Sequence, residues 1–227
     1  MKTLVIIPSR LSATRLPGKP LLKIDGTSMI SHVFKKAEEA NIGEVIVATE
    51  DQEIVDDVKK NGGQVILTKK HHKTGTDRIY EALQKFNNTD IDLIMNLQGD
   101  EPLMNIEDIR GLNNKMVLNQ SELGTLASEI KDRTIYENQN IVKAITTEKL
   151  DNLNFPEAIN FMRKDLKNTK NIYHHLGIYC YQKETLKNFV SFNQSKNELK
   201  SKLEQLRALD NNIKINVALS KSSPIGV

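Results

Sequence analysis

Residues 4–22, LVIIPSRLSATRLPGKPLL, carry the strongest structural signal in the sequence. The stretch opens with the apolar run Leu4-Val5-Ile6-Ile7, and a short apolar run bounded by turn residues is typical of a buried strand. Three prolines and one glycine follow it and predict a stiff loop. In an open α/β sheet, ligands bind just beyond the carboxyl ends of the strands. The loop after this first strand is therefore the first candidate for a binding site.

The chain downstream alternates between strand-like and helix-like segments. Apolar strand-like runs occupy 3–8, 45–48, 65–67 and 91–97, and helical spacing of apolar residues covers 28–41, the segment after Asp51, 76–86 and 106–116. This alternation predicts an α/β fold with a mostly parallel central sheet and helices on both faces.

The pattern changes after about residue 120. We expect strands at 124–130, 141–147, 175–181 and 213–219, a late helix at Leu199–Leu206, and loops with a short helix over 148–171. The interpretation is one domain over 1–227, with a core at 1–120 and a smaller, strand-containing part at 121–227.

The composition excludes several classes of protein. The 32 basic and 29 acidic residues give a net charge of only +3 and form no basic block with interleaved aromatics, so nucleic acid is not expected as a partner. The single cysteine, Cys180, cannot form an internal disulfide, which favours a reducing compartment. No apolar stretch approaches the length of a membrane span. We therefore expect a cytoplasmic protein with no membrane partner.

Cations gather on the loop after the first strand. Arg10, Arg15 and Lys19 suit phosphate oxygens, and Gly18 allows a close backbone approach. The spacing matches neither the Walker loop nor the dinucleotide fingerprint. The alternative is a surface loop whose cations are solvated.

Two further segments are candidates. Gln98-Gly99-Asp100-Glu101-Pro102 follows the fourth strand, and Asp100 there suits a Mg²⁺ ion completed by substrate phosphates, unless the segment is only a turn. Residues 73–78, KTGTDR, open a helix whose N-terminus suits an anion or a base edge. The alternative is that Thr76 or Asp77 simply caps the helix.

The histidine pairs do not predict a metal site. Adjacent residues of a strand point to opposite faces, so we expect one of His174 and His175 to face a ligand pocket and the other to face away. His71 and His72 are expected on the surface. In the segment 203–207, LEQLR, the leucines are core residues, and Glu204 and Arg207 form a solvated pair in the simplest interpretation.

Taken together and in order, these motifs identify a family. The segment at 12–21, GTDR at 75–78, QGDEP at 98–102, HLGIY at 175–179 and LEQLR at 203–207 resemble the 3-deoxy-manno-octulosonate cytidylyltransferases, also called CMP-Kdo synthetases. The resemblance runs from residue 1 to 227. It implies a Rossmann-like nucleotidyltransferase fold, a homodimer, and the reaction of CTP with Kdo to give CMP-Kdo and pyrophosphate for lipopolysaccharide assembly.

The resemblance also implies roles for single residues. Lys19, Arg15 and Asp100 would be catalytic, with Asp100 as a Mg²⁺ ligand and the part at 121–227 serving sugar binding and dimerisation. The nucleotide would be held by Arg10, Arg15, Lys19, Thr74, Gly75, Arg78 and Gln98. The sugar would be held by Arg163, His175, Tyr179, Glu204 and Gln205.

The sequence departs from the family at two places. Family members continue after the final Gly-Val with Asp-Thr, whose Asp is a second metal ligand, so a chain truncated at Val227 is expected to bind CTP but to catalyse weakly. The stretch Met162-Arg163-Lys164-Asp165 differs from the family pattern, and the chain has no Trp. Three alternatives therefore stay open: 8-amino-Kdo as substrate, a nonulosonic or sialic-type acid, or a CTP-binding relative without catalysis.

Overall fold

Strand β1 (Thr3–Ser9) is the central strand of the first structural unit. A computed structural model describes residues 1–12, 16–88, 90–164 and 169–222, which divide into units at 1–110 and 111–222. Leu4, Val5, Ile6 and Ile7 are all completely buried. A parallel strand covered on both faces has such a continuous apolar run, because neither face meets water.

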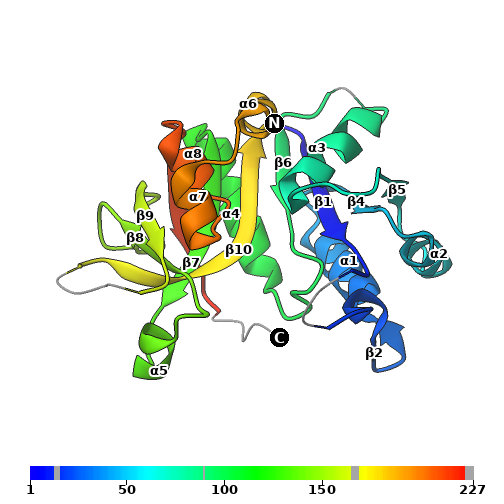
Figure 1. Cartoon of the computed structure of the whole chain (residues 1–227), viewed down its shortest axis with the longest axis horizontal. Coiled ribbons are helices and arrows are strands. Elements are labelled where there is room, and N and C mark those ends of the chain that lie inside the picture. The colour runs from blue at the N-terminus through cyan, green and yellow to red at the C-terminus, as the bar shows by residue number, and fades with distance from the viewer. Residues whose placement is uncertain (13–15, 89, 165–168, 223–227) are drawn as a thin grey trace. The chain divides into compact units, whose positions relative to one another are not determined.

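The first unit contains a wholly parallel sheet (Figure 1). Its strands lie in the order β6 (Leu93–Asn96), β1, β4 (Gly43–Thr49) and β5 (Val65–Leu67). Val5 lies opposite Val45 on one side and Met95 on the other. The chain therefore runs outward from β1 to β5 and then returns to place β6 on the other side of β1.

Helices connect these strands. α1 (Met29–Ala40) joins β1 to β4, α2 (Gln52–Lys60) joins β4 to β5, and α3 (Gly75–Lys85) joins β5 to β6. Crossovers between parallel strands are right-handed, so the two outward crossovers put α1 and α2 on one face and the return puts α3 on the other. α1 and α2 accordingly contact each other.

The point where the strand order reverses lies between β1 and β6. Open α/β sheets bind ligands at this point, beyond the carboxyl ends of the two strands. The segment after β1 forms a short 3₁₀ helix, η1 (Lys19–Leu21), and a small hairpin, β2 (Lys23–Ile24) with β3 (Thr27–Ser28). The candidate loop therefore begins at the switch point.

The second unit is a mixed sheet with helices. Helix α4 (Ile106–Asn119) contains the unit boundary, and β7 (Leu123–Glu129) pairs in parallel with β11 (Ile215–Leu219) and antiparallel with the long β10 (Ile172–Gln182). β8 (Lys143–Thr146) pairs with β10 and with β9 (Ala158–Met162), both antiparallel.

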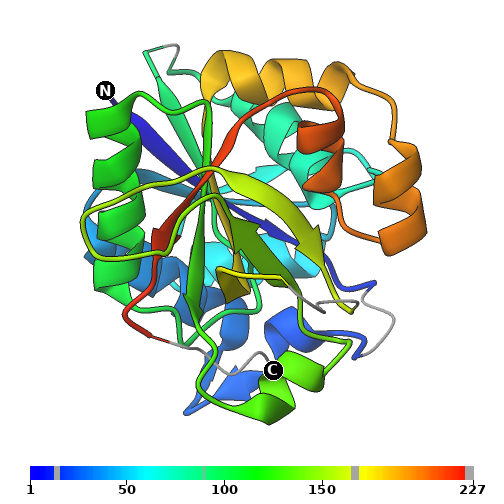
Figure 2. The same ribbon diagram turned by 90° about the vertical axis from the view of Figure 1, so that its left-hand side faces the viewer.

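The helices of the second unit are short. α5 is Arg133–Glu137, α6 is Lys183–Ser191, α7 is Lys196–Ser201 and α8 is Leu206–Asp210. α7 and α8 pack against each other, as Figure 2 shows in orange and red. None of the described helices is long and apolar enough to cross a membrane.

Most predicted elements are confirmed, and the fold class is confirmed with them. The prediction of loops and a short helix over 148–171 is wrong, because the described part of that segment contains strand β9. The prediction of a single late helix is also wrong, because two helices occupy that segment. Lys202, with φ 53°, ends α7 and separates it from α8. Helix α6 directly after β10 was not predicted.

Candidate active site

A cavity of about 290 Å³ lies at the switch point of the first unit. The segments that follow β1 and β6 form two of its walls, and η1 and the N-terminus of α3 form the others. It is lined by Pro8, Ser9, Arg10, Lys19, Pro20, His72, Thr74, Gly75, Arg78, Gln98, Gly99 and Asp100. Three separate sequence segments with predicted ligand-binding residues therefore meet in one cavity.

The loop after β1 is fixed at both ends. The backbone N–H of Leu11 donates to Oδ2 of Asp51 at 2.7 Å, and the N–H of Gly18 donates to the carbonyl oxygen of Leu11 at 3.1 Å. Gly18 has φ 72°, a conformation that favours glycine. Asp51 precedes α2 as predicted, but its carboxylate binds this loop and not the helix. Arg15 lies outside the described residues.

Lys19 and Asp100 meet across the cavity. Lys19 Nζ lies 3.1 Å from Asp100 Oδ2, and the side chains are 12% and 54% exposed. The neighbouring Glu101 is half-buried, and burial together with the charge of Asp100 raises the pKa of its carboxyl. A held ammonium beside an accessible carboxylate suits a ligand that carries both phosphates and a divalent cation.

The N-terminus of α3 is capped by Thr74, where the sequence had suggested Thr76 or Asp77. Thr74 Oγ1 accepts from the N–H of Asp77 at 3.2 Å, and Asp77 Oδ2 accepts from the N–H of Thr74 at 3.1 Å. This reciprocal capping box satisfies two backbone donors within the protein. Thr74 and Gly75 still line the cavity, so the helix N-terminus opens towards it.

Arg78 is buried behind this helix end. Its Nη2 lies 2.5 Å from Oε2 of Glu50, and its Nη1 donates to Oγ1 of Thr68 at 2.5 Å. Burial alone would raise the pKa of Glu50, but the hydrogen bond and charge of Arg78 lower it. The guanidinium therefore joins α3 to the ends of β4 and β5 while it lines the cavity.

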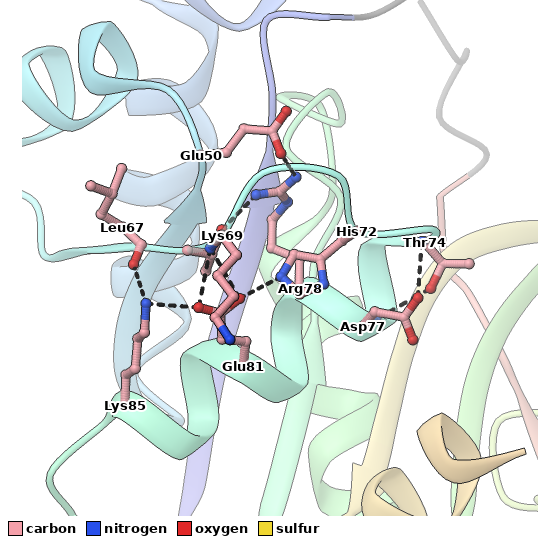
Figure 3. A network of polar contacts seen from close by, with 10 residues as sticks. Glu50, Leu67, Lys69, His72, Thr74, Asp77, Arg78, Glu81 and Lys85 are labelled. Atoms are coloured by element: carbon pink, nitrogen blue, oxygen red, sulfur yellow. Dashed lines mark hydrogen bonds and ion pairs between the residues drawn. The ribbon is translucent and has the colours of Figure 1, made fainter.

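His72 lines the cavity, although its position in the sequence predicted a surface residue. Its side chain is 17% exposed, and its Nε2 lies 2.5 Å from Oε2 of Glu81 (Figure 3). Glu81 also binds the N–H of Lys69 at 3.0 Å and Nζ of Lys85 at 2.7 Å. Burial would raise the pKa of Glu81, but these donors lower it to about 2. The histidine is thus held by a carboxylate that stays charged at neutral pH. That carboxylate lies nine positions later in the chain, so no local pattern could indicate it.

The remaining predicted nucleotide residues also lie at this cavity. Arg10 is exposed at the end of β1, and Gln98 follows β6 with its Nε2 3.5 Å from Oδ1 of Asn96. The structure therefore brings together Arg10, Lys19, Thr74, Gly75, Arg78, Gln98 and Asp100.

The residues predicted to hold the sugar lie in the second unit. His175 on β10 is 8% exposed, and its Nε2 lies 3.0 Å from Oγ1 of Thr125. Its ring lies 4.9 Å from that of Phe161 and 5.5 Å from that of Tyr179. Burial and the charge of His174 lower the pKa of His175 to about 3. His175 is therefore a neutral hydrogen-bonding residue within an aromatic row.

Tyr179 and Glu204 lie close enough to interact. Burial, the hydroxyl of Tyr181 and the charge of Glu204 raise the pKa of Tyr179. Gln205, next along the chain, is 7% exposed. Arg207 is also buried, and it forms hydrogen bonds of 2.6 and 2.8 Å with Glu198. The prediction that Glu204 and Arg207 form a solvated pair is therefore wrong. Arg207 lies 4.0 Å from Glu204, but its main partner comes from α7.

Arg163 follows β9, in the part of the family pattern that this sequence alters. Its Nη1 donates to the carbonyl oxygen of Asn140 at 2.6 Å.

His174 and His175 are adjacent on β10, and His174 lies opposite Lys143 of β8 while His175 contacts Thr125 of β7. Cys180 is completely buried, and burial raises the pKa of its thiol, as expected of a packing residue.

Among the described residues, no group of three or more His, Cys, Asp and Glu side chains is placed to hold a metal ion. A Mg²⁺ ion needs no such cage, because it is usually held by one or two carboxylates and substrate phosphates. The exposed carboxylate of Asp100 fits that arrangement.

Comparisons with known proteins agree with this geometry. Residues 4–215 match the family described as cytidylyltransferase. The chain is 42% identical to a 3-deoxy-manno-octulosonate cytidylyltransferase of Rhodopseudomonas palustris (strain BisB5), over 99% of this chain and 92% of that protein. A relative of the same name from Paramagnetospirillum magneticum is 38% identical over the same shares.

A solved structure supports the relationship. The structure of a CMP:2-keto-3-deoxy-manno-octonic acid synthetase complexed with CTP superposes with a TM-score of 0.90 at 32% identity, over 100% of this chain and 93% of that one. The chain therefore belongs to the cytidylyltransferase family, and within it to the 3-deoxy-manno-octulosonate cytidylyltransferases.

Proposed function

We propose that the protein catalyses the reaction of CTP with 3-deoxy-manno-octulosonate (Kdo) to give CMP-Kdo and pyrophosphate. One observation carries the proposal: three cations predicted for nucleotide binding, Arg10, Lys19 and Arg78, line a single cavity at the switch point of the parallel sheet, together with Asp100, the predicted metal ligand. Relatives that carry the name of this activity cover 99% of the chain.

The transfer is a displacement at the α-phosphorus of CTP. The anomeric hydroxyl of Kdo attacks the phosphorus, its proton is lost, and the bond to the β-phosphate oxygen breaks to release pyrophosphate. Such transfers depend on positioning and on electrostatic stabilisation of negative charge. Lys19 and, by the family resemblance, Arg15 supply the positive charge that offsets it. The backbone hydrogen bonds from Gly18 to Leu11 and from Lys19 to Leu16 keep Lys19 in place.

We also propose that the reaction uses Mg²⁺ held by Asp100 and the CTP phosphates. When bound, the ion neutralises charge on the phosphates. Asp100 is the accessible carboxylate of the cavity, whereas Glu101 is half-buried with a raised pKa. The ammonium of Lys19, 3.1 Å from Asp100, orients this carboxylate.

We propose that Arg163 binds the carboxylate of Kdo and that His175, Tyr179, Glu204 and Gln205 hold its hydroxyl groups. Guanidinium groups bind carboxylates bidentately. The neutral His175 and the protonated Tyr179 hydroxyl are suited to uncharged sugar hydroxyls. A homodimer, a cytoplasmic location and a role in lipopolysaccharide assembly are proposed with this function on the basis of the family resemblance.

Pyrophosphate release tests the proposal. The full-length protein is incubated with CTP, Mg²⁺ and, in parallel, Kdo, 8-amino-Kdo or N-acetylneuraminate. Release with Kdo is expected to exceed release with N-acetylneuraminate. Release with none of the three sugars, while CTP still binds, would leave only nucleotide binding and would reject the enzyme.

Two variants assign the roles in the cavity. Lys19→Met is expected to lower kcat/KM for CTP on the order of 100-fold, as loss of a group that stabilises transition-state charge does. Lys23→Met, at an exposed lysine four positions later, is the matched control. Asp100→Asn is expected to raise the Mg²⁺ concentration for half-maximal activity at least about ten-fold, with Asp56→Asn on the exposed face of α2 as its control. An unchanged Mg²⁺ requirement in Asp100→Asn would remove Asp100 from the metal site.

A further inference from the structure

Lys143 on β8 is a completely buried lysine. Its Nζ donates to the carbonyl oxygen of Asn138 at 2.5 Å and to that of Arg163 at 3.2 Å. No carboxylate among the described residues forms an ion pair with it. Lysine is almost never fully buried without such a partner, because desolvation of the ammonium is costly. A charge kept at this cost calls for a role beyond packing.

The two hydrogen bonds of Lys143 hold Arg163 in place. The ammonium joins the carbonyl group of Arg163 to the segment 138–140, and the Arg163 guanidinium returns to that segment by donating to the carbonyl oxygen of Asn140 at 2.6 Å. Arg163 is thus fixed at its main chain and at its side chain. The main-chain anchor depends on Lys143.

Lys143 interacts electrostatically with two other basic side chains, those of Arg163 and His174. Burial and the charge of Arg163 lower the pKa of Lys143. His174 lies directly opposite Lys143 in the β8–β10 register, and none of the described residues forms a hydrogen bond with its buried Nδ1. Burial and the charge of Lys143 lower the pKa of His174. The ammonium of Lys143 and the guanidinium of Arg163 therefore create a positive potential, and an anion bound by Arg163 would lower it.

We propose that Lys143 is a positioning residue for the carboxylate of the sugar acid. It fixes the main chain of Arg163 through a hydrogen bond to the Arg163 carbonyl oxygen, and it adds buried positive charge next to Arg163. This inference rests on the proposed function, in which Arg163 binds that carboxylate. Lys143 itself does not contact the reacting atoms, and the nucleotide cavity of the first unit does not include it.

Steady-state kinetics with each substrate varied separately test the role. Lys143→Met is expected to raise KM for Kdo about ten-fold and to leave KM for CTP within two-fold. Lys149→Met, at an exposed lysine six positions later, is the matched control and is expected to change neither constant. A lysine that only supported the fold would alter both constants together or neither.

A double-mutant cycle separates action through Arg163 from any independent effect. Arg163→Ala alone is expected to raise KM for Kdo, and adding Lys143→Met to it is expected to raise KM by less than a further two-fold. Fully additive effects, or an unchanged KM for Kdo in Lys143→Met, would overturn the proposal. If wild-type protein binds CTP but turns over no sugar acid, the proposed function fails instead.

Thermal melting and CTP binding verify that each variant is folded. If Lys143→Met does not fold, Lys143→Gln takes its place in both experiments. Glutamine carries no charge and reaches less far than lysine, so it cannot serve both carbonyl groups. The same rise in KM for Kdo and the same non-additivity with Arg163→Ala are expected, and their absence counts against the proposal equally.

Discussion

Glu50 and Arg78 form a buried ion pair, with 2.5 Å between Oε2 and Nη2 and with side-chain exposures of 14% and 3%. Glu50 directly follows β4, and Arg78 lies in the first turns of α3. The pair therefore connects the helix N-terminus at the cavity to the carboxyl end of a neighbouring strand. The pair thereby fixes the position of this helix end at the cavity.

Removal of this carboxylate is expected to destabilise the protein strongly. Glu50→Gln leaves the Arg78 guanidinium buried without a counter-charge, and the expected loss in free energy of unfolding is about 3 kcal/mol. Lys2→Met removes one partner of the exposed Lys2–Asp90 pair and is expected to cost less than about 1 kcal/mol. Urea unfolding of both variants measures the difference, and equal losses would show that burial does not strengthen the pair.

Glu81 gives the first unit a pH-dependent stability. The pKa of this carboxyl is lowered from 4.5 to about 2 in the folded protein, so the stabilisation is complete above pH 4.5 and is lost as the pH falls towards 2. Linkage gives a contribution of about 3 kcal/mol at neutral pH. Glu81→Gln is expected to be less stable than wild type at pH 7, with a difference that shrinks below pH 4.5.

The control is Glu184→Gln, which removes one partner of an exposed pair with Lys187. Urea unfolding at pH 7, 4 and 3 provides the comparison. A constant difference between wild type and Glu81→Gln across this range would contradict the assignment, because a group of low pKa must lose its contribution on protonation.

The sequence predicted the elements that owe their form to local pattern. The run Leu4–Ile7 and the helical spacing of α1 and α3 are strong periodic signals, so their types were clear. Strand β9 was missed because Ala158–Met162 is short and mixed and becomes a strand by pairing with β8. Pairing between distant segments of this kind produces no periodic pattern of apolar residues in the sequence.

The same distinction explains the candidate site. Lys19 and Asp100 could be placed at one edge because both follow parallel strands, and parallel strands share that edge. The link between Glu50 and Arg78, and the capture of His72 by Glu81, depend on side-chain reach between elements. Thr74 was not recognised as the N-cap because all four residues of the segment 74–77 are suitable caps.

His72 is expected to contribute to nucleotide binding. His72 lines the cavity and its Nε2 contacts Glu81, whereas none of the described residues forms a hydrogen bond with its Nδ1. His72→Asn removes the ring and with it one hydrogen bond to the ligand, so KM for CTP is expected to rise about three- to ten-fold. His71→Asn is the control, since His71 has φ 67° and Asn tolerates that conformation. Equal KM values for the two variants would exclude His72 from the site.

Gly99 is required by close packing next to the cavity. A Cβ at this position would lie 3.0 Å from the carbonyl oxygen of Pro8 and 3.2 Å from Cδ1 of Ile30. The backbone at Pro8 cannot yield easily, because it is paired with Ala48 of β4. Gly99→Ala is therefore expected to lower the free energy of unfolding by about 1–3 kcal/mol, the usual cost of overpacking, and to weaken CTP binding.

Gly111 offers the opposite case in the same protein. It lies inside α4, and a Cβ there would meet nothing within 4 Å. Alanine favours a helix over glycine by about 1 kcal/mol, so Gly111→Ala is expected to raise the free energy of unfolding. The two substitutions add the same methyl group, and urea unfolding should give changes of opposite sign. A gain in stability from Gly99→Ala would mean that β1 can move away from β6 at the point where the nucleotide is proposed to bind.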